Sequence, residues 1–217
     1  MSTYNPITLI THPRYLDHDT EGDHHPEIPQ RLVAITETLR ASPLASVISE
    51  AAPREPQRNW LTNFHGSSYL FRFEEEALIG KSYLGHPDNR MCYDSYAVAL
   101  LAAGAGPTAI DLLENNKSDL VFCSIRPPGH HADRSMAMGF CFLNNAVIAA
   151  RYWQQTYGHR HILIIDWDAH HGNGIQAAFD EDPDIFYISI HEHPSFKLSG
   201  DRFCRGNGKR GRSRHNS

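Results

Sequence analysis

Two carboxylates and two imidazoles follow a short apolar run in the stretch ILIIDWDAHHGNG, residues 162–174. Asp166, Asp168 and His170 share parity, so their side chains project to the same side if the backbone stays extended. The carboxylate of Asp168 and the imidazole of His170 then form a ligand pair that suits Zn²⁺ or a similar ion. Because a catalytic zinc normally has three protein ligands and one open position, a third ligand must come from elsewhere.

A tandem pair, His130 and His131, lies in a second polar stretch, RPPGHHAD (126–133). Neighbouring side chains diverge, so the two imidazoles do not chelate one ion from the same face. They suit separate roles as general base and general acid, each oriented by its own partner. Asp166 is placed to orient one of them and Asn173 the other. Because an aspartate raises imidazole basicity and an asparagine mainly fixes the tautomer, we expect the two histidines to differ in pKa.

Apolar runs that alternate with helical patterns predict an α/β fold with a parallel sheet. The strands are expected at 7–12, 119–125, 161–166 and 184–190, and the helices at 27–41, 73–81, 94–115, 142–157 and 173–180. The residues expected to kink or divide the 94–115 helix are Gly104, Gly106 and Pro107. Because the strands lack polar alternation, helices should cover both faces of the sheet. The aromatic residues expected in the core are Phe122, Phe179 and Phe186.

A polar cluster follows each of the last three expected strands. The clusters are RPPGHHAD (126–133), DWDAHHGNG (166–174) and HEHPSF (191–196). In parallel α/β folds, ligands bind outside the carboxyl ends of the strands, so the three clusters should meet at one edge of the sheet. His191 and His193 fit a structural or rim position better than metal ligation.

Length and composition describe one ordinary globular domain, with 217 residues, 41% hydrophobic and 21% charged. The four cysteines show no CxxC spacing and no signal peptide is recognisable, so we expect reduced thiols in a soluble, cytoplasmic protein. No apolar run approaches the ~18 residues that a membrane span needs, so a membrane is not an expected partner.

The charge distribution changes near the C-terminus. The net charge is −5, but residues 202–217 contain six basic residues and no acidic one, so residues 1–201 carry 14 basic and 25 acidic residues, or −11. We expect 199–217 to be a divergent, disordered basic tail. Six charges without a folded motif give only weak, salt-sensitive binding, so nucleic acid is not an expected partner.

Taken together, the polar stretches closely resemble the zinc-dependent histone deacetylase superfamily, which includes acetylpolyamine amidohydrolases and acetoin-utilisation proteins. The matching segments are HPEIPQRL (25–32), RPPGHHA (126–132), MGFCFLNN (138–145), DWDAHHGNG (166–174) and YISIHEH (187–193). The form with Asn173 resembles the class II branch and its bacterial relatives. The resemblance covers roughly 8–198 and implies a three-layer, parallel-sheet arginase/deacetylase-like fold.

The resemblance also implies the reaction, which is hydrolysis of the acetamide of an acetyl-lysine peptide or a small acetylated amine. Zn²⁺ polarises the carbonyl and lowers the pKa of a water, and acetate leaves with a free amine. His130, backed by Asp166, and His131, backed by Asn173, match the two histidines that activate the water and protonate the leaving amine.

Further positions match by motif. Asp168 and His170 match zinc ligands, and Gly139 and Phe140 match the lining of an acyl-lysine channel, where an aromatic wall suits a methylene chain. The positions that match ligands of a structural monovalent cation, K⁺, are Asp166, Asp168, His170 and Ser189, several of them through backbone carbonyls.

The chain departs from the family pattern near Leu198, where relatives continue with a Pro-Gly-Thr-Gly turn. Relatives are considerably longer, and their third zinc ligand, an aspartate, and their oxyanion-binding tyrosine lie beyond the length of this sequence. We therefore expect residues 1–198 to be the N-terminal portion of a deacetylase domain, C-terminally truncated by a frameshift or premature stop. An incomplete sheet would leave an open edge and predicts poor solubility.

Other interpretations remain open at this point. One is a non-catalytic remnant that binds a metal or an acyl-lysine only partially. Another is an arginase-type dimanganese hydrolase, since the DAH triplet at 168–170 also occurs there, but RPPGHHA and GFCFLNN argue against it. The DHH string at 23–25 occurs in some phosphoesterases, but here it precedes a helix rather than following a strand.

Overall fold

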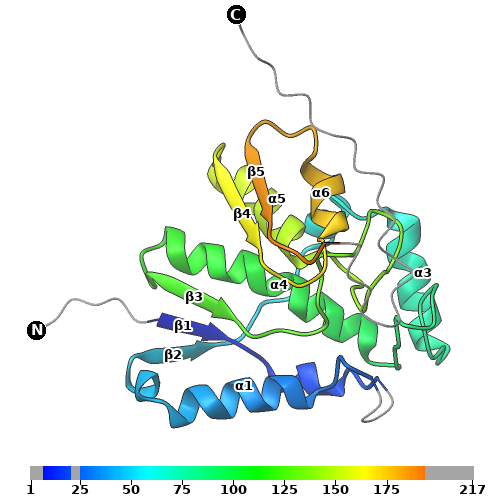
Figure 1. Cartoon of the computed structure of the whole chain (residues 1–217), viewed down its shortest axis with the longest axis horizontal. Coiled ribbons are helices and arrows are strands. Elements are labelled where there is room, and N and C mark those ends of the chain that lie inside the picture. The colour runs from blue at the N-terminus through cyan, green and yellow to red at the C-terminus, as the bar shows by residue number, and fades with distance from the viewer. Residues whose placement is uncertain (1–6, 21–24, 194–217) are drawn as a thin grey trace, which may run out of the picture.

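The computed structural model describes residues 7–20 and 25–193 of the chain (Figure 1). Its strands are β1 (Ile7–Ile10), β2 (Ile48–Ala51), β3 (Leu120–Cys123), β4 (Ile162–Asp166) and β5 (Ile185–Ser189). Its α-helices are α1 (Gln30–Ala41), α2 (Arg58–Thr62), α3 (Ser67–Leu78), α4 (Ser95–Glu114), α5 (Asn145–Tyr157) and α6 (Asn173–Phe179). Short 3₁₀-helices, η1 (Pro13–Asp17) and η2 (Pro43–Ser46), precede α1 and β2.

The strands form parallel ladders with helices packed against them, which confirms the predicted α/β class. One sheet has the strand order β2-β1-β3, and a second sheet consists of β4 and β5. Ile7 is in register with Ile48 and Leu120, and Ile162 is in register with Ile185. Within the described ranges, no strand pairing joins β3 to β4, so the single expected sheet is present as two separate sheets.

Helix α4 lies at the centre of the core, in contact with α3, α5 and β3 (Figure 1). The expected break at Gly104, Gly106 and Pro107 is wrong, because α4 continues through all three. A Cβ on Gly104 would overlap the backbone carbonyl of Arg54, and one on Gly106 would overlap Ala149 of α5. The glycines therefore allow close packing of the helix rather than ending it.

By length and composition alone, α4 could also cross a membrane, with a mean hydropathy of 1.5. The expectation that no apolar segment reaches this length is therefore wrong. However, 56% of its most apolar window is buried inside the protein. The core helix of a globular domain has the same properties, so α4 is only weak evidence for a membrane span.

Several helices begin at residues other than those expected; α1, for example, begins at Gln30 rather than at 27. The helix expected at 142–157 begins at Asn145, because the side chain of Asn144 caps it by accepting a hydrogen bond from the Val147 N–H at 3.2 Å. The helix expected at 73–81 begins six residues earlier, at Ser67, and ends at Leu78. The order of elements was thus predicted better than their ends.

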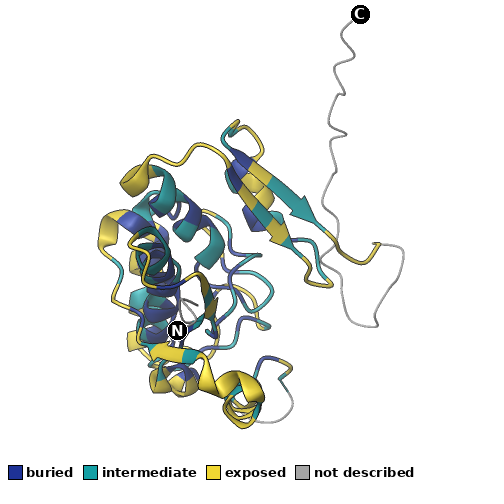
Figure 2. Cartoon of the chain, turned by 90° about the vertical axis from the view of Figure 1, so that its left-hand side faces the viewer, coloured by how far each residue is buried: buried dark blue, intermediate teal, exposed yellow. Residues whose placement is uncertain are grey.

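One face of the β4–β5 ladder is bare among the described residues (Figure 2). Leu163, Ile165 and Phe186 expose 54%, 47% and 68% of their surface. Ile162 and Ile185, on the other face, are buried in a cluster with residues of α5 and α6. The expectation of covered faces is wrong here because no described element buries those three side chains. Of the aromatic residues expected in the core, Phe179 is buried, and Phe122 and Phe186 are not.

Two buried histidines, His18 and His65, make the stability of the fold depend on pH. Burial lowers the pKa of His18 to about 3 and that of His65 to about 4, so both are neutral in the folded chain. Since both folded pKa values lie below the unfolded value of 6.5, their contribution is complete above pH 6.5 and is lost as the pH falls. We expect each to lower the free energy of unfolding by about 1.4 kcal/mol at pH 5.5.

Urea denaturation at pH 7.5 and pH 5.5 checks this expectation. A His65→Gln variant keeps an acceptor for the Asn144 N–H, which donates to His65 Nε2 at 2.9 Å, but it cannot titrate. It should therefore lose about half of the pH-dependent difference. Equal free energies of unfolding at the two pH values would contradict the prediction.

Candidate active site

The loops that follow β3 and β4 meet beside the start of α6. The backbone carbonyl of His130 accepts hydrogen bonds from the N–H groups of Gly174, at 3.0 Å, and Ile175, at 3.3 Å. The first two polar clusters therefore lie together, as expected, although their strands belong to different ladders. Of the third cluster, residues 194–196 lie outside the described residues.

His130 is paired with Asp166, the last residue of β4. The His130 Nδ1 lies 3.0 Å from Asp166 Oδ2, which also accepts a hydrogen bond from the Tyr187 hydroxyl at 3.1 Å. Burial alone would raise the pKa of the Asp166 carboxyl, but hydrogen bonds from His130, the Asp168 N–H and Tyr187 lower it overall. An ionised carboxylate only accepts hydrogen bonds, so His130 carries its proton on Nδ1 and leaves Nε2 as an acceptor.

His131 is paired with Asn173, the first residue of α6. Its Nδ1 lies 2.7 Å from Asn173 Oδ1, and Asn173 Nδ2 donates back to the His131 carbonyl at 3.4 Å. Burial lowers the pKa of His131 to about 4, although the bond to Asn173 opposes the shift. The two imidazole rings lie 3.9 Å apart between centroids. They are oriented by an anion and an amide, the two partners expected from the sequence.

Glycines make the close approach of these side chains feasible. A Cβ on Gly172 would overlap Asp166 Oδ2 and the Tyr187 hydroxyl, and one on Gly139 would overlap the His131 ring. Gly139 also has a φ of +54°, a conformation that favours glycine.

Gly174 offers a test of this packing, because a Cβ there would overlap the backbone carbonyl of Ala132. We expect Gly174→Ala to lower the free energy of unfolding by about 1–3 kcal/mol, measured by urea denaturation. Gly66→Ala is the matched control, since its Cβ would meet nothing closer than 3.8 Å and its φ is −67°. Equal stabilities of the two variants would show that the loop yields without strain.

The expected metal ligands, Asp168 and His170, lie together at the mouth of the site. Asp168 Oδ1 lies 3.2 Å from His170 Nδ1 and 3.9 Å from His130 Nε2. The two side chains are 51% and 41% exposed, so an ion can reach them from solvent. One carboxylate and one imidazole fit zinc in kind. Within residues 7–20 and 25–193, no group of three His, Cys, Asp or Glu side chains is arranged to hold a metal, so the described residues bring no third candidate ligand to this pair.

The expected channel residues, Gly139 and Phe140, follow one another in a strained turn. Phe140 has a φ of +69°, which a residue with a side chain adopts only when its surroundings hold it there. Asn89 Oδ1 accepts a hydrogen bond from the Phe140 N–H at 3.1 Å, and the His25 ring packs edge-on against Phe140 at 4.7 Å. Together they fix the position of the aromatic ring.

The positions expected to bind a monovalent cation are partly brought together. Asp166 and Ser189 are register partners in the β4–β5 ladder. The Asp166 carbonyl accepts a hydrogen bond from the Ile190 N–H at 2.8 Å, and Ser189 Oγ lies 2.7 Å from His191 Nδ1. The His191 ring also lies 4.7 Å from that of His171, tilted by 48°, which places His191 beside the DWDAHHGNG loop.

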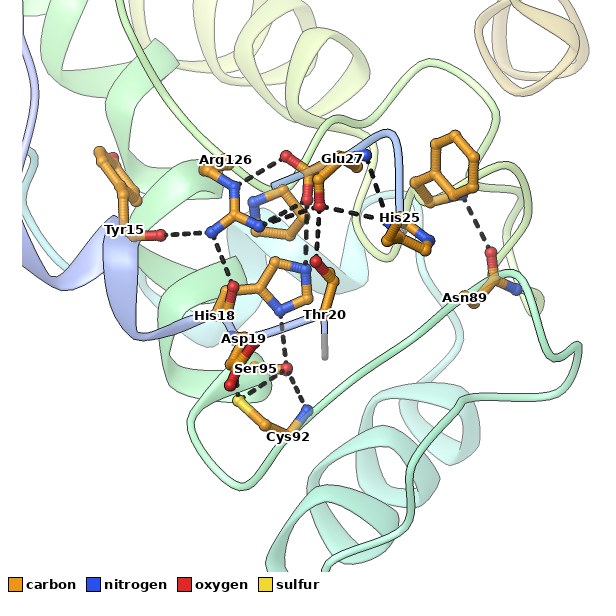
Figure 3. A network of polar contacts seen from close by, with 12 residues as sticks. Tyr15, His18, Asp19, Thr20, His25, Glu27, Asn89, Cys92, Ser95 and Arg126 are labelled. Carbon is orange, nitrogen blue, oxygen red and sulfur yellow. Dashed lines mark hydrogen bonds and ion pairs between the residues drawn. The ribbon is translucent and has the colours of Figure 1, made fainter. Parts of the chain in front are cut away.

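Several residues that hold the site together were not assigned a role from the sequence. Tyr187 lies in the segment YISIHEH (187–193). It shares parity with Ser189, and this alternation is the sequence pattern that could have placed it on the same side of the strand. Asn89 showed no pattern of its own. The pair formed by Glu27 and Arg126 is buried in the network of Figure 3, although 99 residues separate the two in the sequence.

Comparisons with known proteins show which family the chain resembles. The chain is 38% identical over 203 residues to the uncharacterised protein slr0245 of Synechocystis, covering 92% of this chain and 66% of that protein. It is 38% identical to the polyamine deacetylase HDAC10 of Danio rerio, covering 78% of this chain and 26% of that protein. The crystal structure of the HDA15 HD domain matches 87% of this chain and 54% of its own, with a TM-score of 0.81 and 34% identity.

The chain thus spans less than two thirds of the length of each of these relatives. The family model of the histone deacetylase domain matches residues 25–216. This range includes His130 and His131 with their partners, and the Asp168–His170 pair. The chain therefore belongs to the histone deacetylase family.

Proposed function

We propose that this chain contributes to zinc-dependent hydrolysis of acetamides, with an acetyl-lysine peptide or a small acetylated amine as substrate. The observation that carries the proposal is the pair of oriented histidines, His130 and His131, behind the Asp168 and His170 side chains. His130 and His131 bind through Nδ1 to Asp166 and Asn173 and leave both Nε2 atoms as proton acceptors. The names of relatives as histone and polyamine deacetylases support the reaction class.

Zinc fits the donor set of Asp168 and His170, with one further ligand needed. A bound zinc would polarise the substrate carbonyl and make the attacking water more acidic. The chain's own contribution is to move protons. Asp166 accepts the Nδ1 proton of His130 and leaves Nε2 free to accept one. His131, held by Asn173, is then placed to serve the leaving amine.

Phe140 and Gly139 support the substrate class. An aromatic ring fixed by Asn89 and His25 offers an apolar wall to a methylene chain, whether that of lysine or of a polyamine. K⁺ as a structural cation belongs to the same proposal, at Asp166, Asp168, His170 and Ser189; the proximity of Asp166 and Ser189 supports it.

Zinc titration combined with turnover of an acetylated lysine peptide and of an acetylated polyamine tests the proposal. We expect saturable zinc binding that His170→Ala weakens about 10-fold or more, together with release of acetate. Zinc binding without acetate release from either substrate would instead support a non-catalytic binding protein. Unchanged zinc affinity in His170→Ala would overturn the metal assignment.

A further inference from the structure

The buried side chain of Arg126 has every hydrogen-bond donor satisfied (Figure 3). Its Nε and Nη2 donate to the two carboxylate oxygens of Glu27, both at 2.7 Å. Its Nη1 donates to the backbone carbonyls of Tyr15, at 2.8 Å, and His18, at 2.7 Å. The remaining Nη2 proton faces the Glu27 carbonyl at 3.4 Å. Five donors meet five contacts in fixed directions, so the guanidinium has one allowed orientation.

Glu27 is held as firmly as Arg126, and both are nearly inaccessible, at 2% and 1% exposed. The Glu27 carbonyl accepts a hydrogen bond from Thr20 Oγ1 at 2.7 Å, and its N–H donates to His25 Nδ1 at 3.1 Å. His25 Nε2 then donates to the Asp88 carbonyl at 3.2 Å. Glu27 is therefore a fixed point on the segment that matches HPEIPQRL, a motif to which the proposed reaction assigns no role.

The position of Arg126 in the chain gives this anchor its significance. Arg126 follows the end of β3 and begins the loop that carries His130 and His131, four and five residues later. The far end of the same loop is fixed by the bonds from Gly174 and Ile175 to the His130 carbonyl. The loop is thus held at both ends, once by α6 and once by Glu27.

A buried ion pair is by itself weak evidence for stability, because apolar residues of similar volume often serve as well. A planar guanidinium with five directed donors, however, specifies an orientation that an apolar side chain cannot specify. An error of about 1 Å in the placement of catalytic groups is enough to impair a site. The contacts therefore favour a role in positioning over a role in stability alone.

We infer that Glu27 and Arg126 form a positioning pair, which fixes the direction in which the loop carrying His130 and His131 leaves β3. The pair contacts neither substrate nor metal and acts through the backbone of the loop. The inference rests on the proposed function for its significance, but its structural content can be tested without turnover.

The test uses the full chain labelled with ¹⁵N-histidine. NMR reports the Nδ1–H protons of His130 and His131, which are bonded to Asp166 and Asn173. Arg126→Lys keeps the charge but lacks the planar guanidinium that makes two parallel hydrogen bonds to Glu27. In this variant and in Glu27→Gln, we expect both protons to exchange with solvent about tenfold faster or more. The matched control for the chemistry is Arg40→Lys, since Arg40 binds Glu50 in the same two-point manner at the surface.

Leu70→Ala is the control for destabilisation, because Leu70 is fully buried in the core cluster of α3. The inference is supported if exchange is faster in Arg126→Lys and Glu27→Gln but not in Leu70→Ala, compared under conditions that give the variants the same free energy of unfolding. Unchanged exchange in a folded Arg126→Lys or Glu27→Gln overturns it, as does a failure of both variants to fold at 10 °C, which would make the pair a stability element. Absence of turnover in the unmodified chain would refute the proposed function and leave this readout intact.

Discussion

Asp166→Asn should lower the turnover of an acetylated substrate by about 10²- to 10⁴-fold, while the chain stays folded. Every contact of the carboxylate requires an acceptor: Oδ1 accepts from the Asp168 N–H at 3.2 Å, and Oδ2 accepts from His130 and Tyr187. An amide has one acceptor oxygen, so its NH₂ group must face one of these donors. If it faces His130, the imidazole shifts its proton to Nε2 and can no longer accept one there.

Initial rates of acetate release, with zinc content and thermal unfolding measured in parallel, check this result. Asn173→Asp is the matched control, because it keeps an acceptor oxygen for His131 Nδ1 and gives up only the charge neutrality and the long contact from Nδ2 to the His131 carbonyl at 3.4 Å. It should lower turnover far less than Asp166→Asn. A rate for Asp166→Asn within about threefold of the unmodified chain would show that the orientation of His130 does not limit the reaction.

Arg126→Met should have the largest effect on stability, lowering the free energy of unfolding by about 3–5 kcal/mol. The substitution leaves the Glu27 carboxylate buried without its counter-ion, and the carbonyls of Tyr15 and His18 lose their donor. Combining it with Glu27→Leu removes the isolated charge and should recover part of the loss. Recovery is incomplete because the two carbonyls remain without a donor in both variants.

Urea denaturation of the single and double variants measures these differences. Arg40→Met provides the comparison, because the Arg40 and Glu50 side chains are 60% and 44% exposed. Breaking that pair should change stability by less than about 1 kcal/mol. A double variant no more stable than Arg126→Met would show that the lost hydrogen bonds, and not the isolated charge, dominate.

The sequence predicted the parts of this protein that depend on local pattern. Apolar runs predicted the strands, and polar residues after β3 and β4 predicted where the site lies, because parallel strands direct their carboxyl ends to one side. Parity and chemistry predicted that Asp166 would orient one of the two histidines and Asn173 the other. The family resemblance implied which partner goes with which histidine, and the hydrogen bonds show both contacts. The catalytic and metal-binding roles of these residues stay predictions.

Features that depend on distant pairing left no such pattern. Glu27 and Arg126 lie in two motifs that match the family, HPEIPQRL and RPPGHHA, but nothing in either motif pairs the two residues. Only the fold brings them together. The left-handed conformation of Phe140 is set by Asn89 and His25, far away in the chain. Gly104 and Gly106 were misread as helix breakers because a close tertiary contact cannot be distinguished from a local break. The tail at 199–217 lies outside the described residues.

Among the described residues, one face of β4 is packed and the other is bare, so neighbouring positions of this strand should tolerate substitution very differently. At Ile162, which is 6% exposed, substitution by a polar residue removes core contacts and should lower the stability of the fold. At the adjacent Leu163, which is 54% exposed, the same exchange removes apolar surface from contact with water and leaves the core intact. Among close variants of this chain, hydrophobic character along β4 should thus be retained at every second residue and drift freely between them.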